Sequence, residues 1–341
     1  MTSLKDAVVV VTGASAGIGR ATALAFADRG SAVALVARRQ DVLEDVADEC
    51  RAKGVDALVL PADVADAEAM DEVAAEVAGR FGRIDVWVNN AGVSLFGRLE
   101  ETPLNAWYRV IETNLFGVFH GMRAALPWMR EQGSGVIINV SSMLGKITAP
   151  YSSSYVASKH GVLALSDSAR QELLDVPDIK VCTVLPGSID TSLFTEAGNY
   201  TGREIKPPTP VIPAERVAAA IVRCAARPQR EVAVGVSTSV SLGLNRLIPG
   251  GTRRAAAKRL DDDFFRDVLE QPNPGKIFEP LEDGEAGVSG GWARTGAKVG
   301  SDSARAASGG RSVRRSRWAT LGVAAVVGAG VAGAAVRNRR S

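Results

Sequence analysis

The chain has 341 residues, of which 46% are hydrophobic, 23% charged and 5% aromatic. This is enough to bury a large core, and it excludes a collagen-like, disulfide-stapled or wholly disordered protein. The formal net charge of +2 is the sum of a basic C-terminal segment and an acidic remainder. Residues 294–341 hold ten Lys and Arg and one Asp, a net charge of +9, and the other residues carry a net charge of −7. An acidic body argues against nucleic-acid binding, so no nucleic-acid partner is expected.

Cysteine and histidine usage narrows the chemistry further. Cys50, Cys182 and Cys224 are far apart and form no Cys-x-x-Cys pair, which favours core positions in a reducing, cytoplasmic compartment and no metal site. His120 and His160 are the only histidines, so a His-rich metal site is excluded. The first six residues, Met-Thr-Ser-Leu-Lys-Asp, are mostly polar, and we expect no signal peptide.

Short apolar runs alternate with longer amphipathic segments over the first 235 residues. The apolar runs predict strands at Ala7–Val11, Ala32–Val36, Ala57–Leu60, Ile84–Val88, Val136–Val140, Lys180–Leu185 and Glu231–Val234. The segments between them predict helices at Gly17–Asp28, Asp41–Lys53, Asp66–Phe81, Pro103–Arg130, Ser152–Leu174 and Pro213–Ala226. Strands that are apolar throughout are typical of a sheet covered on both faces. We therefore expect an α/β fold, a doubly wound parallel sheet of the Rossmann type, in one domain of residues 1–235.

The pattern changes after residue 235. Helices are expected at Ser239–Ile248 and Thr252–Leu269, outside the sheet, which makes residues 236–282 a helical appendage. Residues 283–317 are rich in Gly, Ser, Ala and Arg, a composition typical of a flexible linker. Residues 318–336 then carry no charge.

The first predicted strand leads directly into a glycine-rich turn that opens a helix, with the sequence Gly-x-x-x-Gly-x-Gly. Glycines allow a tight turn and let backbone N–H groups approach a pyrophosphate, while the helix N-terminus adds positive potential. Because the turn lies between a strand and a helix, we expect it to bind a dinucleotide, the alternative being a sharp turn without a ligand. The expected contacts are Gly13, Ser15, Gly17, Ile18 and Gly19.

The end of the second predicted strand bears on which dinucleotide binds. An acidic residue there would accept a hydrogen bond from the adenosine ribose of NAD, but this chain has Arg38 and Arg39. A guanidinium group pairs well with a 2′-phosphate. The two arginines therefore favour NADP(H) over NAD(H), unless they are simply solvated.

A Tyr-x-x-x-Lys pattern, Tyr155 and Lys159, lies on the helix after the fifth strand. This spacing puts both side chains on one helical face. A phenol has a pKa of about 10, and a nearby ammonium group would lower it, so Tyr155 is a candidate acid/base that exchanges a proton with a substrate oxygen. Ser142, just past a strand end, would orient that oxygen, and Ser141 is the alternative.

Together these motifs resemble the short-chain dehydrogenase/reductase family of the single-domain type, over roughly residues 5–235. The matching pieces are Thr12–Gly19, Asp63, Val64, Asn89, Asn90, Ala91, Gly92, Asn114, Ser142, Tyr155, Lys159, Pro186, Gly187 and Thr191. The resemblance implies a nicotinamide dinucleotide on a Rossmann-type sheet and the interconversion of alcohols and carbonyls. One departure concerns the cofactor: many NADP-preferring relatives carry a basic residue where this chain has Ala16.

The resemblance also implies roles for the matching residues. Beyond the glycine turn and the arginines, it implies cofactor contacts at Asp63, Val64, Asn90, Ala91, Gly92, Tyr155, Lys159, Pro186, Gly187, Ile189 and Thr191. Asp63 and Val64 would contact the adenine, and Ile189 and Thr191 would anchor the carboxamide.

For catalysis, the resemblance implies that Ser142 orients the substrate oxygen and that Tyr155 is the acid/base. Lys159 would bind the nicotinamide ribose and tune Tyr155, and Asn114 would hold a water in a proton relay. Structural alternatives remain for several positions: Asn114 as a buried polar residue of a helix, Asn89 as a tie between strands, and His160 as a structural residue.

The loop of residues 192–213 follows a strand end and is rich in apolar residues and proline. Such loops cover the substrate in doubly wound sheets, so an apolar small molecule is the expected substrate, although ordinary packing explains the composition as well. The long helices at Pro103–Arg130 and Ser152–Leu174 would form a homo-oligomer interface by analogy with relatives.

The uncharged run, Trp318–Val336, has 19 residues and would span about 28 Å as a helix, close to the thickness of the hydrocarbon core of a membrane. Arginines flank it, and Trp318 stands where an interfacial aromatic residue is expected. It holds only one Leu, so a disordered or surface-associating tail is the alternative. We predict a transmembrane helix that anchors a cytoplasmic catalytic domain to the membrane.

The sequence therefore predicts an NADP(H)-dependent oxidoreductase. Two other functions remain open: a non-catalytic dinucleotide-binding sensor or scaffold, and a nucleotide-sugar epimerase or dehydratase. The intact Ser, Tyr and Lys set weighs against the first. The glycine spacing and the lack of a second substrate domain weigh against the second.

Overall fold

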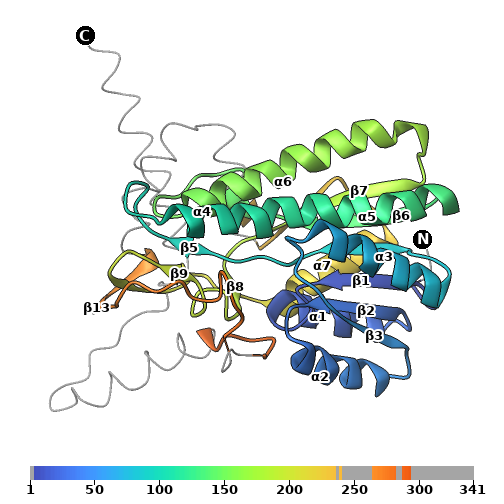
Figure 1. Ribbon diagram of the computed structural model, residues 1–341, viewed down its shortest axis with the longest axis horizontal. Coiled ribbons are helices and arrows are strands. Elements are labelled where there is room, and N and C mark those ends of the chain that lie inside the picture. Colours follow the sequence, from blue (N-terminus) through green and yellow to red (C-terminus); the bar gives the residue numbers. More distant parts are fainter. Residues whose placement is uncertain (1–3, 236–237, 240–262, 282–285, 293–341) are drawn as a thin grey trace, which may run out of the picture.

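The computed structural model describes residues 4–235, 238–239, 263–281 and 286–292. Its centre is a seven-stranded sheet in which all neighbouring strands are parallel (Figure 1). In spatial order the strands are β12 (Glu231–Val234), β7 (Ile179–Pro186), β6 (Gly135–Val140), β4 (Val86–Asn89), β1 (Val8–Thr12), β2 (Ala32–Ala37) and β3 (Ala57–Pro61). The chain first builds outward from β1 to β3 and then crosses to β4. The predicted Rossmann-type sheet is thus confirmed, with the topological switch between β1 and β4.

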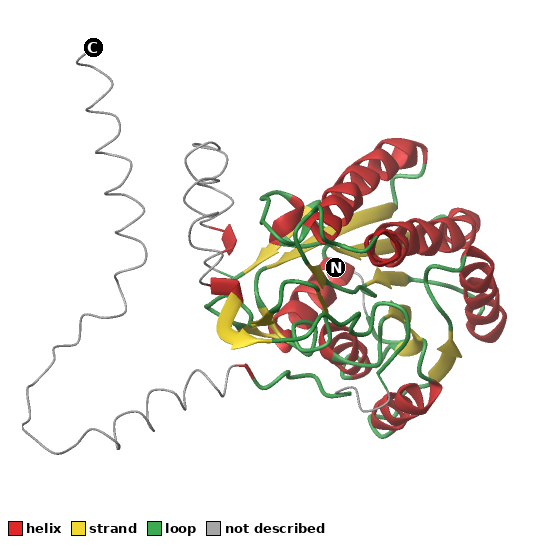
Figure 2. Cartoon of the chain, turned by 60° about the vertical axis from the view of Figure 1, so that its left-hand side comes forward, coloured by secondary structure: helices red, strands yellow, loops and turns green. Residues whose placement is uncertain are grey.

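Helices cover both faces of the sheet (Figures 1 and 2). One face carries α1 (Gly17–Ala27), α2 (Gln40–Arg51) and α7 (Ala214–Ala226). The other carries α3 (Ala67–Phe81), α5 (Gly117–Gln132) and α6 (Ser153–Glu172), with α4 (Leu104–Ile111) beside α6. The alternation of β1 explains this sandwich: Val9 and Val11 face the first set of helices, and Val8 and Val10 face the second.

The predicted helix over residues 103–130 has a wider turn in its middle. Between α4 and α5 the chain forms a π-helical turn, η1 (Glu112–Phe116), and the Gly117 N–H bonds to the Glu112 carbonyl. Asn114 lies in this turn and is fully buried. Such π-turns occur frequently at functional sites.

Short strands extend the fold beyond the carboxyl ends of the main sheet. β5 (Leu95–Phe96) pairs with β9 (Gly198–Asn199), and β8 (Ile189–Asp190) pairs with β11 (Ile212–Pro213). β10 (Arg203–Ile205) pairs with β13 (Phe265–Leu269) in antiparallel fashion. Two 3₁₀ turns, η2 (Met143–Gly145) and η3 (Leu173–Asp175), complete the elements in the described parts of the chain.

β13 corrects the expected helix over Thr252–Leu269, because residues 265–269 form a strand. Phe264 and Phe265 are buried in a cluster with Phe96 and Ile205. Packing against this cluster, together with pairing to β10, outweighs the local helical pattern. Residues 252–262 and 240–248 lie outside the described parts of the chain.

Residues 286–292 also differ from the expected linker of residues 283–317, because they pack against the domain. Ser289 Oγ donates to the Asp190 carboxylate at 2.8 Å, and the Trp292 indole donates to the Thr191 carbonyl at 3.2 Å. The glycine-rich composition reflects close approach here: a Cβ on Gly290 would lie 2.4 Å from the Thr191 carbonyl carbon.

The predicted transmembrane segment, residues 318–336, lies outside the described residues, as do residues 293–317. Among the helices that the structure does describe, none has the length and apolar character needed to cross a membrane. The membrane anchor therefore stays a prediction.

Candidate active site

A cavity of about 420 Å³ lies at the carboxyl ends of the central strands. It extends from the arginines after β2, past the glycine-rich turn, to the start of α6. All residues that the sequence predicts for catalysis or cofactor contact line it, with the exception of Gly19 and Asn114. The sheet topology produces this convergence, because parallel strands end at one edge and their loops meet there.

Glycine is required in the turn between β1 and α1 for space and for backbone conformation. Gly17 has φ +54°, and a Cβ there would lie 2.9 Å from the Thr191 side chain. A Cβ on Gly19 would lie only 1.9 Å from the Gly13 carbonyl oxygen. Gly19 is therefore a packing position that lets helix and turn meet, and this explains why it does not line the cavity.

Asn90 ties the end of β4 to the glycine turn. Its side-chain amide donates to the Thr12 carbonyl at 2.9 Å, and its backbone N–H donates to the Thr12 hydroxyl at 3.0 Å. These bonds hold the two strands that flank the topological switch. Asn90 lines the cavity beside Ala91 and Gly92.

The end of the cavity next to β2 carries Arg38 and Asp63, and both side chains bond to other groups of the protein. Arg38 donates to the backbone carbonyls of Phe278 at 2.6 Å and Lys276 at 2.9 Å. Burial lowers the pKa of the Arg38 guanidinium, and the Asp63 charge opposes that shift. The Asp63 carboxylate forms an ion pair with Arg109. Arg39 is more peripheral, with its guanidinium 2.9 Å from the Asp41 carboxylate.

Ser142 and Tyr155 meet at the other end of the cavity. Ser142 follows β6 and caps η2, where its hydroxyl accepts a hydrogen bond from the Leu144 N–H at 3.1 Å. Tyr155 lies in the first turn of α6. Burial raises the pKa of its phenol, and a hydrogen bond with the Ser142 hydroxyl lowers it by less.

Lys159 lies one helical turn after Tyr155 and is buried. Its Nζ donates to the Val140 carbonyl at 2.9 Å and lies 5.6 Å from the centre of the Tyr155 ring. Burial lowers the pKa of Lys159 to about 8. The expected lowering of the Tyr155 pKa by this ammonium group is not seen in this structure, because burial dominates for the phenol.

Ser141 and Ser142 have different partners. Ser141 Oγ donates to the Lys159 carbonyl at 2.9 Å, so it joins β6 to α6. Ser142 lines the cavity together with Tyr155, and its hydroxyl acts to lower the phenol pKa.

Asn114 serves the framework of the site. Its Oδ1 accepts from the Val93 N–H at 2.8 Å, and its Nδ2 donates to the Val93 carbonyl at 2.9 Å. The side chain thus clamps the segment after β4 onto the π-turn. The Asn89 side chain, as expected, ties strands together through a 2.9 Å bond to Asn139.

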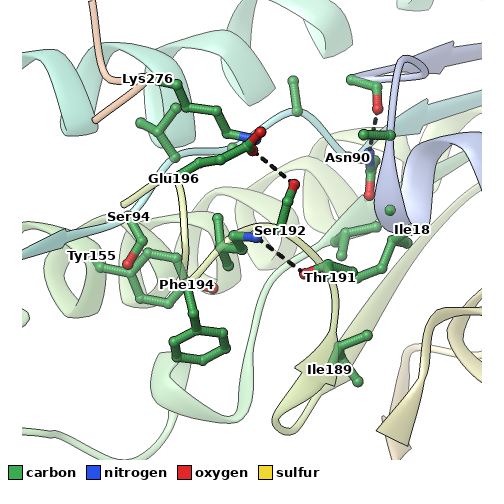
Figure 3. Close-up of a pocket in the computed structure, with 18 of the residues that line it drawn as sticks. Ile18, Asn90, Ser94, Tyr155, Ile189, Thr191, Ser192, Phe194, Glu196 and Lys276 are labelled. Carbon is green, nitrogen blue, oxygen red and sulfur yellow. Dashed lines mark hydrogen bonds and ion pairs between the residues drawn. The ribbon is translucent and has the colours of Figure 1, made fainter. Parts of the chain in front are cut away.

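Apolar side chains surround the end of the cavity near Tyr155. This lining consists of Phe96, Met143, Leu144, Leu193, Phe194, Pro208, Pro210 and Phe264. Beside it, the buried Glu196 accepts a 2.7 Å hydrogen bond from Ser192 and forms an ion pair with Lys276 (Figure 3). Sequence reasoning missed Phe96, Glu196, Phe264 and Lys276, since no motif marks them and they come from distant segments.

The fold and the cavity define an α/β protein of the Rossmann type, and comparisons with known proteins identify the family. The family model for short chain dehydrogenases matches residues 7–200. Over 300 residues, the chain is 33% identical to the uncharacterized oxidoreductase YxnA of Bacillus subtilis, covering 86% of this chain and 83% of that protein. The chain therefore belongs to the short-chain dehydrogenase/reductase family of oxidoreductases.

Solved structures share this fold. An alcohol dehydrogenase from the archaeon Thermococcus sibiricus, complexed with 5-hydroxy-NADP, is 33% identical with a TM-score of 0.58; the match covers 67% of this chain and 95% of that one. A short-chain dehydrogenase/reductase from Burkholderia phymatum, in complex with NAD, has a TM-score of 0.66 and covers 80% of this chain and all of that one. Its identity of 23% makes it evidence for the fold alone.

Replacing Lys159 should remove a component of the pH dependence of stability. Burial lowers its pKa from the ordinary 10.5 to about 8, so between these values the unfolded chain binds a proton that the folded protein has released. The free energy of unfolding therefore gains up to about 1.4 kcal/mol per pH unit over this range as pH rises. Denaturant titrations should show this component in the wild type and lose it in Lys159→Met.

The exposed Lys180 provides the control, and Lys180→Met should keep the pH-dependent component. Identical pH profiles for the wild type and Lys159→Met would contradict the lowered pKa.

Proposed function

We propose that this protein is an NADP(H)-dependent oxidoreductase that interconverts an alcohol and a carbonyl group on a lipophilic small molecule. The observation that carries the proposal is the joint position of Ser142, Tyr155 and Lys159 on one cavity that also contains the glycine-rich turn. A binding site for a dinucleotide alone needs the turn but not the reactive set. Membership of an oxidoreductase family supports the same conclusion.

The groups along the cavity suit a nicotinamide dinucleotide. The N-terminus of α1 and the glycine-rich turn line the cavity and give it positive potential and close backbone approach, which suit a pyrophosphate. We assign Asp63 and Val64 to the adenine side. The remaining assigned contacts are Gly13, Ser15, Gly17, Ile18, Arg38, Arg39, Asn90, Ala91, Gly92, Pro186, Gly187, Ile189 and Thr191. When bound, the nicotinamide supplies or accepts a hydride.

In the reduction direction, Ser142 donates a hydrogen bond that orients the substrate carbonyl. As hydride reaches the carbonyl carbon, the Tyr155 phenol gives its proton to the oxygen, and the alcohol forms. Burial favours the protonated phenol, which is the form this step needs. The Lys159 ammonium stabilises the phenolate that remains. Asn114 fixes the backbone beside the proton relay that we assign to this site.

An apolar substrate is supported by the side chains around the reactive end. Phe96, Phe194 and Phe264 line this part of the cavity together with Leu193 and Met143. Burying apolar substrate surface against them is favourable by about 25 cal/mol per Å². A lipophilic ketone or alcohol is therefore the substrate class to test.

Tyr155→Phe should lower turnover by about 10²- to 10⁴-fold, because it removes the proton that the substrate oxygen exchanges. The Kd for NADP⁺ should change little, since the ring remains. We would measure kcat on a panel of lipophilic ketones with NADPH, and use Tyr108→Phe, an exposed phenol, as the control. Retained turnover in Tyr155→Phe across the panel would refute the assigned mechanism. Cofactor binding by the wild type with no turnover on any substrate would favour the sensor or scaffold.

The preference for NADP(H) rests on Arg38, which lines the cavity and is partly buried. Arg38→Gln should weaken NADP⁺ binding by about 10- to 100-fold, the cost of losing hydrogen bonds to a charged phosphate. NAD⁺ binding should change far less. Isothermal titration with both cofactors tests this, with Arg39→Gln as the matched control, for which we expect a smaller effect. Equal losses for NADP⁺ and NAD⁺ would assign Arg38 a purely structural role.

We also propose that residues 318–336 anchor the cytoplasmic catalytic domain to a membrane. The 19 uncharged residues between arginines support this. In cell fractionation the full-length chain should sediment with membranes and resist high-salt extraction. A chain ending at Arg317 should remain in the supernatant. If both stay in the supernatant, there is no anchor.

A further inference from the structure

Two stretches near the C-terminus, residues 276–281 and 286–292, run along the cavity from end to end. We call them together the C-terminal strap. Their contacts fall on the same residues that we assign to the dinucleotide, at three points described below. The match to the family model ends at residue 200, before these stretches begin.

The first point is the adenosine end, where arginines hold the strap by its backbone. Arg38 donates to the carbonyls of Lys276 and Phe278. Arg39 donates to the Leu281 carbonyl at 3.2 Å. The side chains that distinguish NADP from NAD in our proposal are therefore also the side chains that position the strap.

The second point is the glycine-rich turn. The Gly17 N–H donates to the Gly287 carbonyl at 3.0 Å, and the Arg20 guanidinium donates to the Ala286 carbonyl at 2.7 Å. These contacts bring the strap to the N-terminus of α1, where we assign the pyrophosphate.

The third point is the nicotinamide end. The Asp190 carboxylate accepts from Ser289 Oγ and from the Trp292 N–H, each at 2.8 Å. The Trp292 indole donates to the Thr191 carbonyl. Thr191 is one of the residues assigned to the carboxamide, and Asp190 precedes it, so this stretch of the strap lies at the end of the cavity assigned to the nicotinamide.

The strap borders the cavity without filling it. Lys276, Pro280, Leu281 and Ala286 line the same 420 Å³ space as the glycine turn. Arg38 has five N–H donors, and its two hydrogen bonds to the strap leave other donors to meet a phosphate. Because the strap and the glycine turn line the same space, a ligand in the cavity would contact both.

We propose that the C-terminal strap is the outer wall of the dinucleotide site and retains the bound cofactor. This rests on the proposed function, and it adds a binding element that lies beyond the catalytic domain predicted from the sequence. Cofactor release then requires the strap to detach from Asp190 and Thr191. Loosening the strap should accelerate dissociation and weaken binding.

Two glycines of the strap provide a matched pair of variants. A Cβ on Gly290 would lie 2.4 Å from the carbonyl carbon and oxygen of Thr191, so Gly290→Ala must push the strap away from the domain. A Cβ on Gly287 would meet nothing closer than 3.5 Å, so Gly287→Ala leaves the strap in place. Both variants add one methyl group to the same segment of the full-length chain.

Stopped-flow fluorescence would measure NADPH dissociation, and titration would give its Kd. For Gly290→Ala we expect release about tenfold faster and a correspondingly higher Kd. A tenfold change corresponds to the free energy lost with one or two hydrogen bonds. Gly287→Ala should match the wild type. Unchanged constants in Gly290→Ala, or tighter binding, would overturn the proposal; tighter binding would make the strap a competitor of the cofactor.

Amide hydrogen exchange in the wild type gives a second test that needs no variant. Binding of NADP⁺ should increase the protection of residues 286–292, because a retained ligand adds contacts to the wall. Decreased or unchanged protection would overturn the proposal. If the wild type binds neither NADP⁺ nor NAD⁺, the proposed function fails; if it binds and the strap tests fail, the strap inference alone is wrong.

Discussion

Two hydrogen bonds between the end of β6 and helix α6 hold the reactive groups together. Lys159 Nζ donates to the Val140 carbonyl, and Ser141 Oγ donates back to the Lys159 carbonyl. Each bond satisfies a buried polar group that would otherwise be costly. Because both bonds join the same two elements, they fix the position of α6 along β6. Tyr155 and Ser142 then lie together on the cavity.

The environment of this pair also changes the chemistry that the pattern alone suggests. A Tyr and a Lys one turn apart suggest a lowered phenol pKa. The buried phenol has a raised pKa, and the buried Lys159 has a lowered one. Burial disfavours the charged form of each group, so the protein by itself keeps Tyr155 protonated. Any positive charge brought by an oxidised nicotinamide would act against burial and favour the phenolate needed for alcohol oxidation.

How far the sequence predicts this molecule depends on whether the signal is local. The central sheet was predictable because Val8 to Val11 alternate between two helix layers and each must be apolar. The convergence of Ser142, Tyr155 and Lys159 on one cavity was predictable because their motifs have fixed spacing; their catalytic roles stay a prediction. The role of Ser141 was not, since adjacent serines look equivalent until the position of α6 is known. Strand β13 was missed because Phe264 and Phe265 owe their conformation to a cluster formed by distant segments.

The C-terminal strap shows the same limit of sequence-based prediction, here for glycine residues. A stretch rich in Gly and Ser reads as a linker, yet Gly290 is small because the Thr191 backbone lies against it. Composition cannot distinguish a glycine that gives freedom from one that permits contact. The distinction bears on the proposed function. The Arg38 guanidinium supports the strap through two carbonyls, and it is also the group that we propose for a 2′-phosphate. Cofactor preference and cofactor retention then depend on one side chain, so Arg38→Gln should weaken NADP⁺ binding and also loosen the wall that Gly290→Ala disturbs from the opposite end.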